Sequence, residues 1–133
     1  HINTTNDGMQ IATTTEWLFI APLHFRNGVI LQELRCYYRD SNGFHNWVRV
    51  YGQIKRRGYT YESTANVGSA VDTTTSASGS SSFILHSSAD LLESVIDTAS
   101  NTYYLDVRLQ SSCPSCSNIE FFGCRIEYEE PVL

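Results

Sequence analysis

The sequence predicts a single all-β domain, an antiparallel β-sandwich of the jelly-roll type with an extended N-terminal arm. The chain has 133 residues, the usual length of one domain with one core. Aromatic residues make up 12% of it and include eight tyrosines, which favour strands over helices. Apolar and polar residues alternate in several segments, and no long segment has helical spacing. Five or more antiparallel strands without a long helix indicate a sandwich or a barrel.

The first 15 residues form a polar, threonine-rich segment, HINTTNDGMQIATTT. Its apolar anchors are Ile2, Met9 and Ile11, so we expect an extended arm that could act as an intersubunit strand. The single sandwich domain is expected to span residues 16–133. Its first segment, Glu16 to Leu23 (EWLFIAPL), is apolar on both faces, which predicts a buried strand.

Two alternating segments flank Asn42-Gly43, a dipeptide that favours a tight hairpin. We therefore expect residues 29–39 and 46–56 to be paired strands. The inward side chains of the first are predicted to be Ile30, Leu34, Cys36 and Tyr38. Those of the second are predicted to be Val48, Val50 and Ile54, with Trp47, Arg49, Tyr51 and Gln53 on the opposite face.

The second half of the chain predicts a loop region and further strands. Residues 62–82 have little apolar content and are expected to form a long loop or a run of edge strands. Residues 83–96 are the one candidate for helical structure, of at most a short turn. Residues 102–110 and 118–128 alternate as strands. Their inward side chains are predicted to be Tyr103, Leu105, Val107 and Leu109 in the first and Phe122, Cys124, Ile126 and Tyr128 in the second.

Four cysteines suggest two disulfides, for which three connectivities are possible. Cys36 and Cys124 both fall on the inward face of a strand, so we predict that they pair. Cys113 and Cys116 (CPSC) then remain in a polar loop, where they form either a local ring or bonds between subunits. A redox role is disfavoured because no helix follows Cys116, and a four-cysteine zinc site because the other two cysteines are isolated.

Charge and hydropathy restrict the partners of the protein. The formal net charge is −5 and the pI about 5.2, which argues against nucleic acid, because that partner requires a basic surface. The one basic cluster, residues 55–57, is interpreted as a solvated strand end. No apolar segment is long enough to span a bilayer. The sequence begins at His1 without an initiator methionine or a leader, as expected of a mature secreted, extracellular or cell-surface protein.

No motif for catalysis or metal binding is present in the sequence. The histidines His24, His45 and His86 lack the short spacings of metal ligands, and no nucleophile motif marks a catalytic serine. We therefore expect neither an enzyme nor a cofactor. Four aromatic residues on or near the second alternating segment could instead stack on sugar rings or anchor a partner, with packing at the flank of the core as the equal alternative. They are Trp47, Tyr51, Tyr59 and Tyr61.

Two stretches resemble a known family. They are APLHFRNGVILQELRCYYRD (Ala21 to Asp40) and IDTASNTYYLDVRLQ followed by NIEFFGCRIEY (Ile96 to Tyr128). The chain is similar here to a β-sandwich domain of unknown function found in secreted bacterial proteins, over roughly residues 17–128. That pattern has aliphatic or small residues where this chain has Cys36 and Cys124, which supports their pairing across the core. The resemblance carries over no catalytic residue.

These observations lead to one functional hypothesis with two alternatives. The leading hypothesis is an extracellular structural protein that forms a homo-oligomer or polymer, such as a filament, a pilus-like fibre or a surface layer. The arm or an edge strand would dock on the next subunit by strand addition. A carbohydrate-binding or adhesive surface module is the first alternative, and a viral coat or fibre protein is the second.

Overall fold

The computed structural model describes residues 2–3, 9–11, 16–40, 48–60, 64–73, 85–111 and 119–131. This part of the chain is all-β and contains no helix that is long and apolar enough to cross a membrane. Its strands are β1 (Ile2–Asn3), β2 (Met9–Ile11), β3 (Glu16–Leu23), β4 (Ile30–Asp40), β5 (Val48–Gly58), β6 (Thr64–Asp72), β7 (Leu85–Val95), β8 (Asn101–Ser111) and β9 (Ile119–Glu129).

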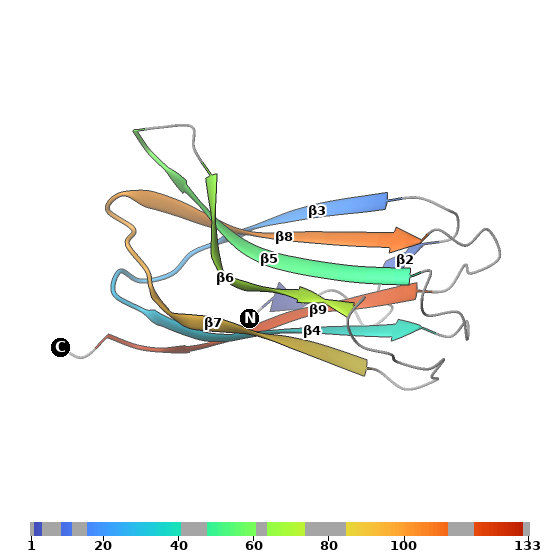
Figure 1. Cartoon of the computed structure of the whole chain (residues 1–133). Helices are drawn as coiled ribbons and strands as arrows, with labels where there is room; N and C mark the ends of the chain where they lie inside the picture. Colours follow the sequence, from blue (N-terminus) through green and yellow to red (C-terminus); the bar gives the residue numbers. More distant parts are fainter. Residues whose placement is uncertain are drawn as a thin grey trace.

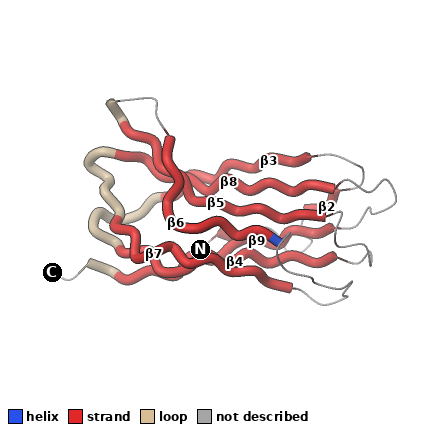
Figure 2. Tube along the Cα trace, viewed as in Figure 1, coloured by secondary structure: helices blue, strands red, loops and turns tan. Residues whose placement is uncertain are grey.

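The strands form two antiparallel sheets packed face to face (Figures 1 and 2). The first sheet has the order β1-β9-β4-β7, with β2 also paired to β9, and the second has the order β3-β8-β5-β6. Consecutive strands from β2 to β9 alternate between the two sheets, except for the neighbours β5 and β6. This is the jelly-roll arrangement, which confirms the predicted fold class.

The core lies between the sheets and follows the period-two pattern of the strands. Leu105, Val107 and Leu109 of β8 are buried as predicted, and they face the first sheet across the sandwich. Val50 and Ile54 of β5 are also fully buried as predicted. The side chain of Val48 lies outside the described residues.

A bulge in β4 makes the prediction for Ile30 wrong. Between Leu31 and Glu33 the register of β4 shifts against β9, so that β4 has one extra residue there. Against β7 the register shifts at the same place, but there the extra residues lie in β7. An extra residue exchanges the two faces of a strand. Before the bulge the core therefore contains Val29 and Leu31, whereas Ile30 faces outward and is partly exposed.

A second bulge corrects the prediction for the last strand in the same way. The register between β4 and β9 shifts at Tyr37/Tyr38, which leaves Phe122 as the extra residue of β9. Phe121 is consequently the core residue, 3% exposed, and Phe122 lies beneath the Arg39 guanidinium at 5.5 Å from its ring centroid. Cys124 and Ile126 are buried as predicted, but Tyr128 is 46% exposed at the end of the sandwich.

One prediction about strand pairing and one about strand burial are also wrong. Residues 29–39 and 46–56 do not form a hairpin, because β4 belongs to the first sheet and β5 to the second. The apolar strand β3 is not buried on both faces. It pairs with β8 at the edge of the second sheet, and its outward residues Leu18 and Ile20 are 53% and 62% exposed. Residues 62–82 do contain an edge strand, β6.

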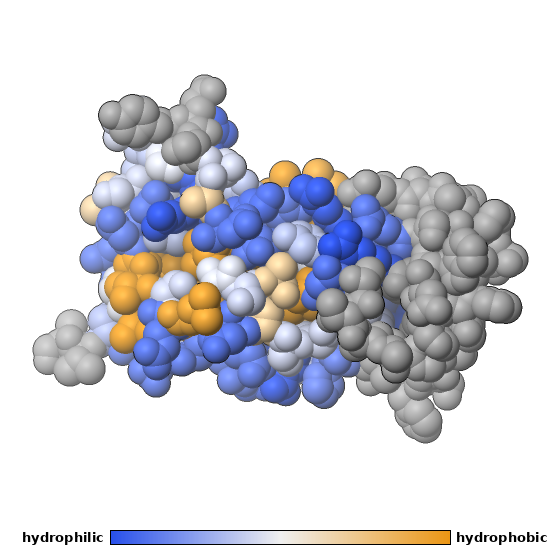
Figure 3. Space-filling view, viewed as in Figure 1, coloured by the Kyte–Doolittle hydropathy of each residue, from blue (hydrophilic) through white to orange (hydrophobic). Residues whose placement is uncertain are grey.

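In the described part of this segment, residues 85–96, the structure has a strand and no helical turn. Within β7, Leu92 and Glu93 have positive φ angles of 58° and 51°, and this irregularity faces the bulge of β4. Asp90 accepts a hydrogen bond from the Leu92 amide at 2.7 Å, so a short polar turn interrupts the strand. The turn leaves Leu92 and Val95 exposed, and apolar atoms gather on the surface along β7 (Figure 3).

The predicted disulfide between Cys36 and Cys124 is confirmed. The two residues are direct partners in the register of β4 and β9, with a Cα–Cα distance of 4.0 Å. The bond therefore joins neighbouring strands of one sheet and does not cross the core as predicted, although both cysteines are almost completely buried. Cys113 and Cys116 lie outside the described residues, so their predicted local or intersubunit bonds stay predictions.

Candidate functional site

The outer face of the second sheet carries a buried ionic cluster. On β8 the core residues alternate with outward side chains, among them Tyr104, Asp106 and Arg108. Asp106 is only 4% exposed, and its carboxylate lies 3.1 Å from the Lys55 ammonium and 3.4 Å from the Arg108 guanidinium. A carboxylate this deeply buried requires cationic partners. The cluster therefore connects β8 to β5 through the pair of Asp106 and Lys55.

A second ion pair lies toward the other end of β5. The Arg49 guanidinium donates to Asp72 of β6 at 2.6 Å and 3.0 Å, and to Gln110 of β8 at 3.3 Å. It also stacks over the ring of Tyr51 at 5.0 Å from the centroid. Arg49 therefore ties three neighbouring strands together and covers one of the predicted contact residues.

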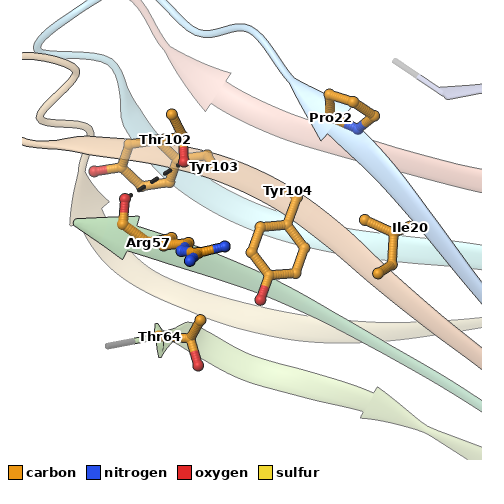
Figure 4. A pocket seen from close by; sticks show the side chains of 7 residues that line it. All are labelled: Ile20, Pro22, Arg57, Thr64, Thr102, Tyr103 and Tyr104. Atoms are coloured by element: carbon orange, nitrogen blue, oxygen red, sulfur yellow. Dashed lines mark hydrogen bonds between the residues drawn. The ribbon is translucent and has the colours of Figure 1, made fainter. Parts of the chain in front are cut away.

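A hollow of about 380 Å³ lies on the same face, next to the ionic cluster. Its walls come from all four strands of the sheet. Ile20 and Pro22 of β3 lie on one side of Tyr104, and the Arg57 guanidinium points toward this tyrosine from the other side (Figure 4). The remaining lining residues are Thr64, Thr102 and Tyr103.

A second hollow of about 330 Å³ lies where β3 and β8 meet the end loops of the sandwich. It shares Pro22, Thr102 and Tyr103 with the first hollow, so the two hollows are adjacent. Tyr59, which follows β5, is 64% exposed at its rim. Its further lining residues are Leu23, His24, Phe25, Thr98 and Asn101.

Backbone hydrogen bonds hold the loops that surround the second hollow. The Gly28 amide donates to the Ile96 carbonyl at 2.8 Å, and the Ile96 amide donates to the Val29 carbonyl at 2.8 Å. These bonds join the loop after β3 to the loop after β7. The Tyr59 amide donates to the Ser100 carbonyl at 3.0 Å. This bond joins the segment after β5 to the loop between β7 and β8, at the same end of the sandwich.

The four aromatic residues predicted as contacts do not form one strip. Tyr59 lies at the second hollow, whereas Tyr51 is half-buried under Arg49 and lines neither hollow. Trp47 and Tyr61 lie outside the described residues. The predicted arm residues Ile2, Met9 and Ile11 lie in β1 and β2, which pair with β9 of the same chain.

The sequence reasoning missed Tyr104 and Arg57 as candidate site residues. Alternation placed Tyr104 on the outer face of its strand, but nothing in the pattern indicated that residues of β3 would enclose it. The basic cluster was interpreted as a solvated strand end, yet its members have different environments. Lys55 pairs with the buried Asp106, and Arg57 lines the first hollow.

The outer face of the first sheet carries ion pairs. Glu33 lies 2.8 Å from the Arg35 guanidinium, and its negative charge raises the pKa of Arg35. Arg39 pairs with the largely buried Glu120 at 2.5 Å. In the part of the chain that the structure describes, no three His, Cys, Asp or Glu side chains converge to hold a metal ion.

The fold and the hollows define the class of molecule: a two-sheet jelly-roll domain with a disulfide in one sheet and two adjacent hollows on the other. Comparison with known proteins finds no matching family model, no matching curated sequence and no matching solved structure. The resemblance to a bacterial secreted family is therefore supported only as far as its β-sandwich fold.

Proposed function

We propose that the chain is an extracellular structural protein that assembles with copies of itself through its N-terminal arm or its sheet edges. The observation that carries this proposal is the way the arm is attached. It pairs with β9 through two residues of β1 and three residues of β2. Two such short strands make few backbone hydrogen bonds, so we expect the arm to leave this edge readily.

The pairing at β9 depends on backbone groups, and an arm from a neighbouring copy can form the same bonds. Strand addition uses main-chain hydrogen bonds for affinity, and exchange of an identical element is a low-cost route to oligomers. An arm that enters the next subunit leaves its own β9 open for a third. Repeated exchange of this kind produces an open chain of subunits rather than a closed dimer.

The part of β9 that follows Cys124 restricts where an arm from a neighbouring copy can pair. Among the described residues, β9 pairs with β4 alone after Cys124. This part carries Arg125, Glu127 and Glu129, and the first two form an exposed ion pair at 3.4 Å. Charged side chains protect an edge against unspecific pairing, so strand addition is restricted to residues 119–124, where the arm lies.

The disulfide favours an extracellular location. Cys36 and Cys124 form a buried bond, and such structural bonds persist in oxidising compartments. Intracellular chaperones are absent outside the cell. A covalent link within the sheet that accepts the arm therefore helps each subunit of a fibre or layer to stay folded.

Deletion of residues 1–12 tests the proposal. The buried core runs from Val29 to Ile126, with four partly buried residues between Phe19 and Phe25 packed against it. We therefore expect the shortened chain to fold, with circular dichroism unchanged and a cooperative melting transition. Electron microscopy should show fibres or layers for the full chain and only monomers after the deletion. Assemblies that survive the deletion unchanged would refute the role of the arm.

A cysteine pair distinguishes exchange from attachment to the same chain. Ile11 and Ile119 are direct partners in the register of β2 and β9. In the double variant Ile11→Cys/Ile119→Cys, oxidation of the assembled protein should give a ladder on a non-reducing gel. The single variant Ile11→Cys is the control, because it retains every native cysteine and lacks the second partner. A double variant that runs as a monomer when taken from intact assemblies would show that arms are not exchanged.

A further inference from the structure

The second hollow, which we call the end pocket, lies where three segments of the chain meet at one end of the sandwich (Figure 1). These segments are the end of β3 with the loop after it, the residue that follows β5, and the loop between β7 and β8 with the start of β8. Its volume of about 330 Å³ is at the lower end of the range for small-molecule sites. The end pocket therefore fits one ring-shaped unit of a ligand with its substituents.

The end pocket has one tyrosine ring that is accessible to a ligand. Tyr59 is 64% exposed at the rim. The other two benzene-type rings of the lining take part in packing, because Phe25 contacts Tyr103 and Tyr128 edge to face, with centroids 6.1 Å and 6.4 Å apart. Tyr103 itself is only 5% exposed. An open tyrosine ring offers an apolar face to the C–H groups of a sugar ring and a hydroxyl group to its polar edge.

The polar side chains of the end pocket are those of His24, Thr98, Asn101 and Thr102. The lining that the structure describes includes no lysine, arginine, aspartate or glutamate. Hydroxyl, amide and imidazole groups both donate and accept hydrogen bonds, so they match ligand hydroxyl groups of either orientation. A charged ligand would lose water here without gaining an opposite charge. The lining therefore favours an uncharged ligand that is rich in hydroxyl groups.

The end pocket is already formed in the free protein. Asp97 holds the loop between β7 and β8, because its amide donates to the Tyr103 hydroxyl at 2.9 Å and its carbonyl accepts from the Asn101 side chain at 3.3 Å. The Thr98 amide donates to the Asn27 side chain at 3.0 Å, which joins this loop to the one after β3. Walls that the fold holds in place need little ordering when a ligand binds, so the cost of binding is reduced.

We propose that the end pocket binds one neutral sugar residue of a glycan. The C–H face of the sugar stacks on the Tyr59 ring, and its hydroxyl groups exchange hydrogen bonds with His24, Thr98 and Asn101. A proline-rich peptide is disfavoured as the occupant, because such peptides dock in grooves lined by several aromatic rings and the end pocket exposes one tyrosine. The proposal does not depend on self-assembly, because the arm pairs with β9 in the other sheet.

Saturation-transfer difference NMR on the full chain tests the proposal, because it observes the ligand and works for a monomer or an assembly. The neutral probes are the methyl glycosides of glucose, galactose, mannose, fucose, N-acetylglucosamine and N-acetylgalactosamine. The charged probe is the methyl glycoside of glucuronic acid, and the peptide probe is hexaproline. We expect at least one neutral glycoside to bind with a Kd of about 1 mM or tighter, and more tightly than the other two kinds of probe. No binding of any neutral glycoside, or tighter binding of the glucuronide or of hexaproline, would overturn the proposal.

Matched variants locate the binding to the end pocket. Tyr59→Ala should weaken binding of the preferred glycoside about tenfold or more, whereas Tyr59→Phe, which keeps the ring, should stay within about threefold. Tyr37→Ala is the control for the loss of an aromatic ring, because Tyr37 lies in the first sheet against His86 and does not line the end pocket. Thermal melts confirm that each variant is folded. Unchanged binding by Tyr59→Ala, or an equal loss with Tyr37→Ala, would show that the sugar does not bind in the end pocket.

Discussion

Reduction of the disulfide between Cys36 and Cys124 should remove much of the stability of the domain. The bond closes a loop with a sequence separation of 88 residues. On the chain-entropy model, opening a loop of this length lowers the free energy of unfolding by about 4.6 kcal/mol at 25 °C. Most domains are stable by only about 5 to 15 kcal/mol, so the reduced protein should be marginally folded or unfolded.

Urea denaturation, followed by intrinsic fluorescence, measures this loss with and without a reductant. For a slope near 2 kcal/mol per M, the midpoint should fall by about 2 M on reduction. The slope itself should rise, because the reduced unfolded chain is more expanded. The measurement uses a Cys113→Ser/Cys116→Ser background, so that only the bond between β4 and β9 is broken. A decrease below about 1 kcal/mol would contradict the loop-closure argument.

The double variant Cys36→Ala/Cys124→Ala separates the cross-link from packing. The Cys36 sulfur lies 3.1 Å from the position that a Cβ would occupy on Gly52 of β5, so the bond fills the space between the sheets there. Reduction retains both sulfur atoms, whereas the alanine variant removes them. We expect the alanine variant to be less stable than the reduced protein by about 1 to 2 kcal/mol, the contribution of the buried atoms.

Two further substitutions test unusual backbone positions at the edge where β6 lies against β7. Gly68 has a φ of +69°, and an added Cβ would lie 2.5 Å from the Leu91 Cα, so Gly68→Ala should lower stability by about 2 to 4 kcal/mol. Ser69→Ala, the exposed neighbour, should change it by less than about 0.5 kcal/mol in the same thermal melts. Leu92 has a φ of 58° and is 65% exposed, so Leu92→Asn should raise stability by about 0.5 to 1 kcal/mol. Val95→Asn, at an exposed position of the same strand, should bring no gain. Equal effects of the two asparagine substitutions would show that the backbone of Leu92 is not strained.

The alternating pattern predicted the core wherever a strand has an unbroken register. β8 is the clear case, because its apolar core residues Tyr103, Leu105, Val107 and Leu109 follow the pattern, whereas Asp106 on the outer face is buried by its ion pairs. The prediction failed at Ile30 and Phe122, where a bulge inserts one residue and exchanges the two faces. Bulges depend on how neighbouring strands fit together, and the sequence of one strand contains no direct sign of them. The same pattern nevertheless placed Cys36 and Cys124 correctly, because both lie where the register agrees.

The candidate site was less predictable than the core because strand pairing determines it. The sequence contains no sign that β3 lies beside β8, which brings Pro22 opposite Tyr104 in the register. It equally contains no sign that β5 lies on the other side of β8, where Lys55 faces the same tyrosine. The predicted hairpin would have placed β4 at an edge of β5 that β6 or β8 occupies in the structure. Tyr59 alone was identified from its sequence as a candidate contact and is found at the second hollow.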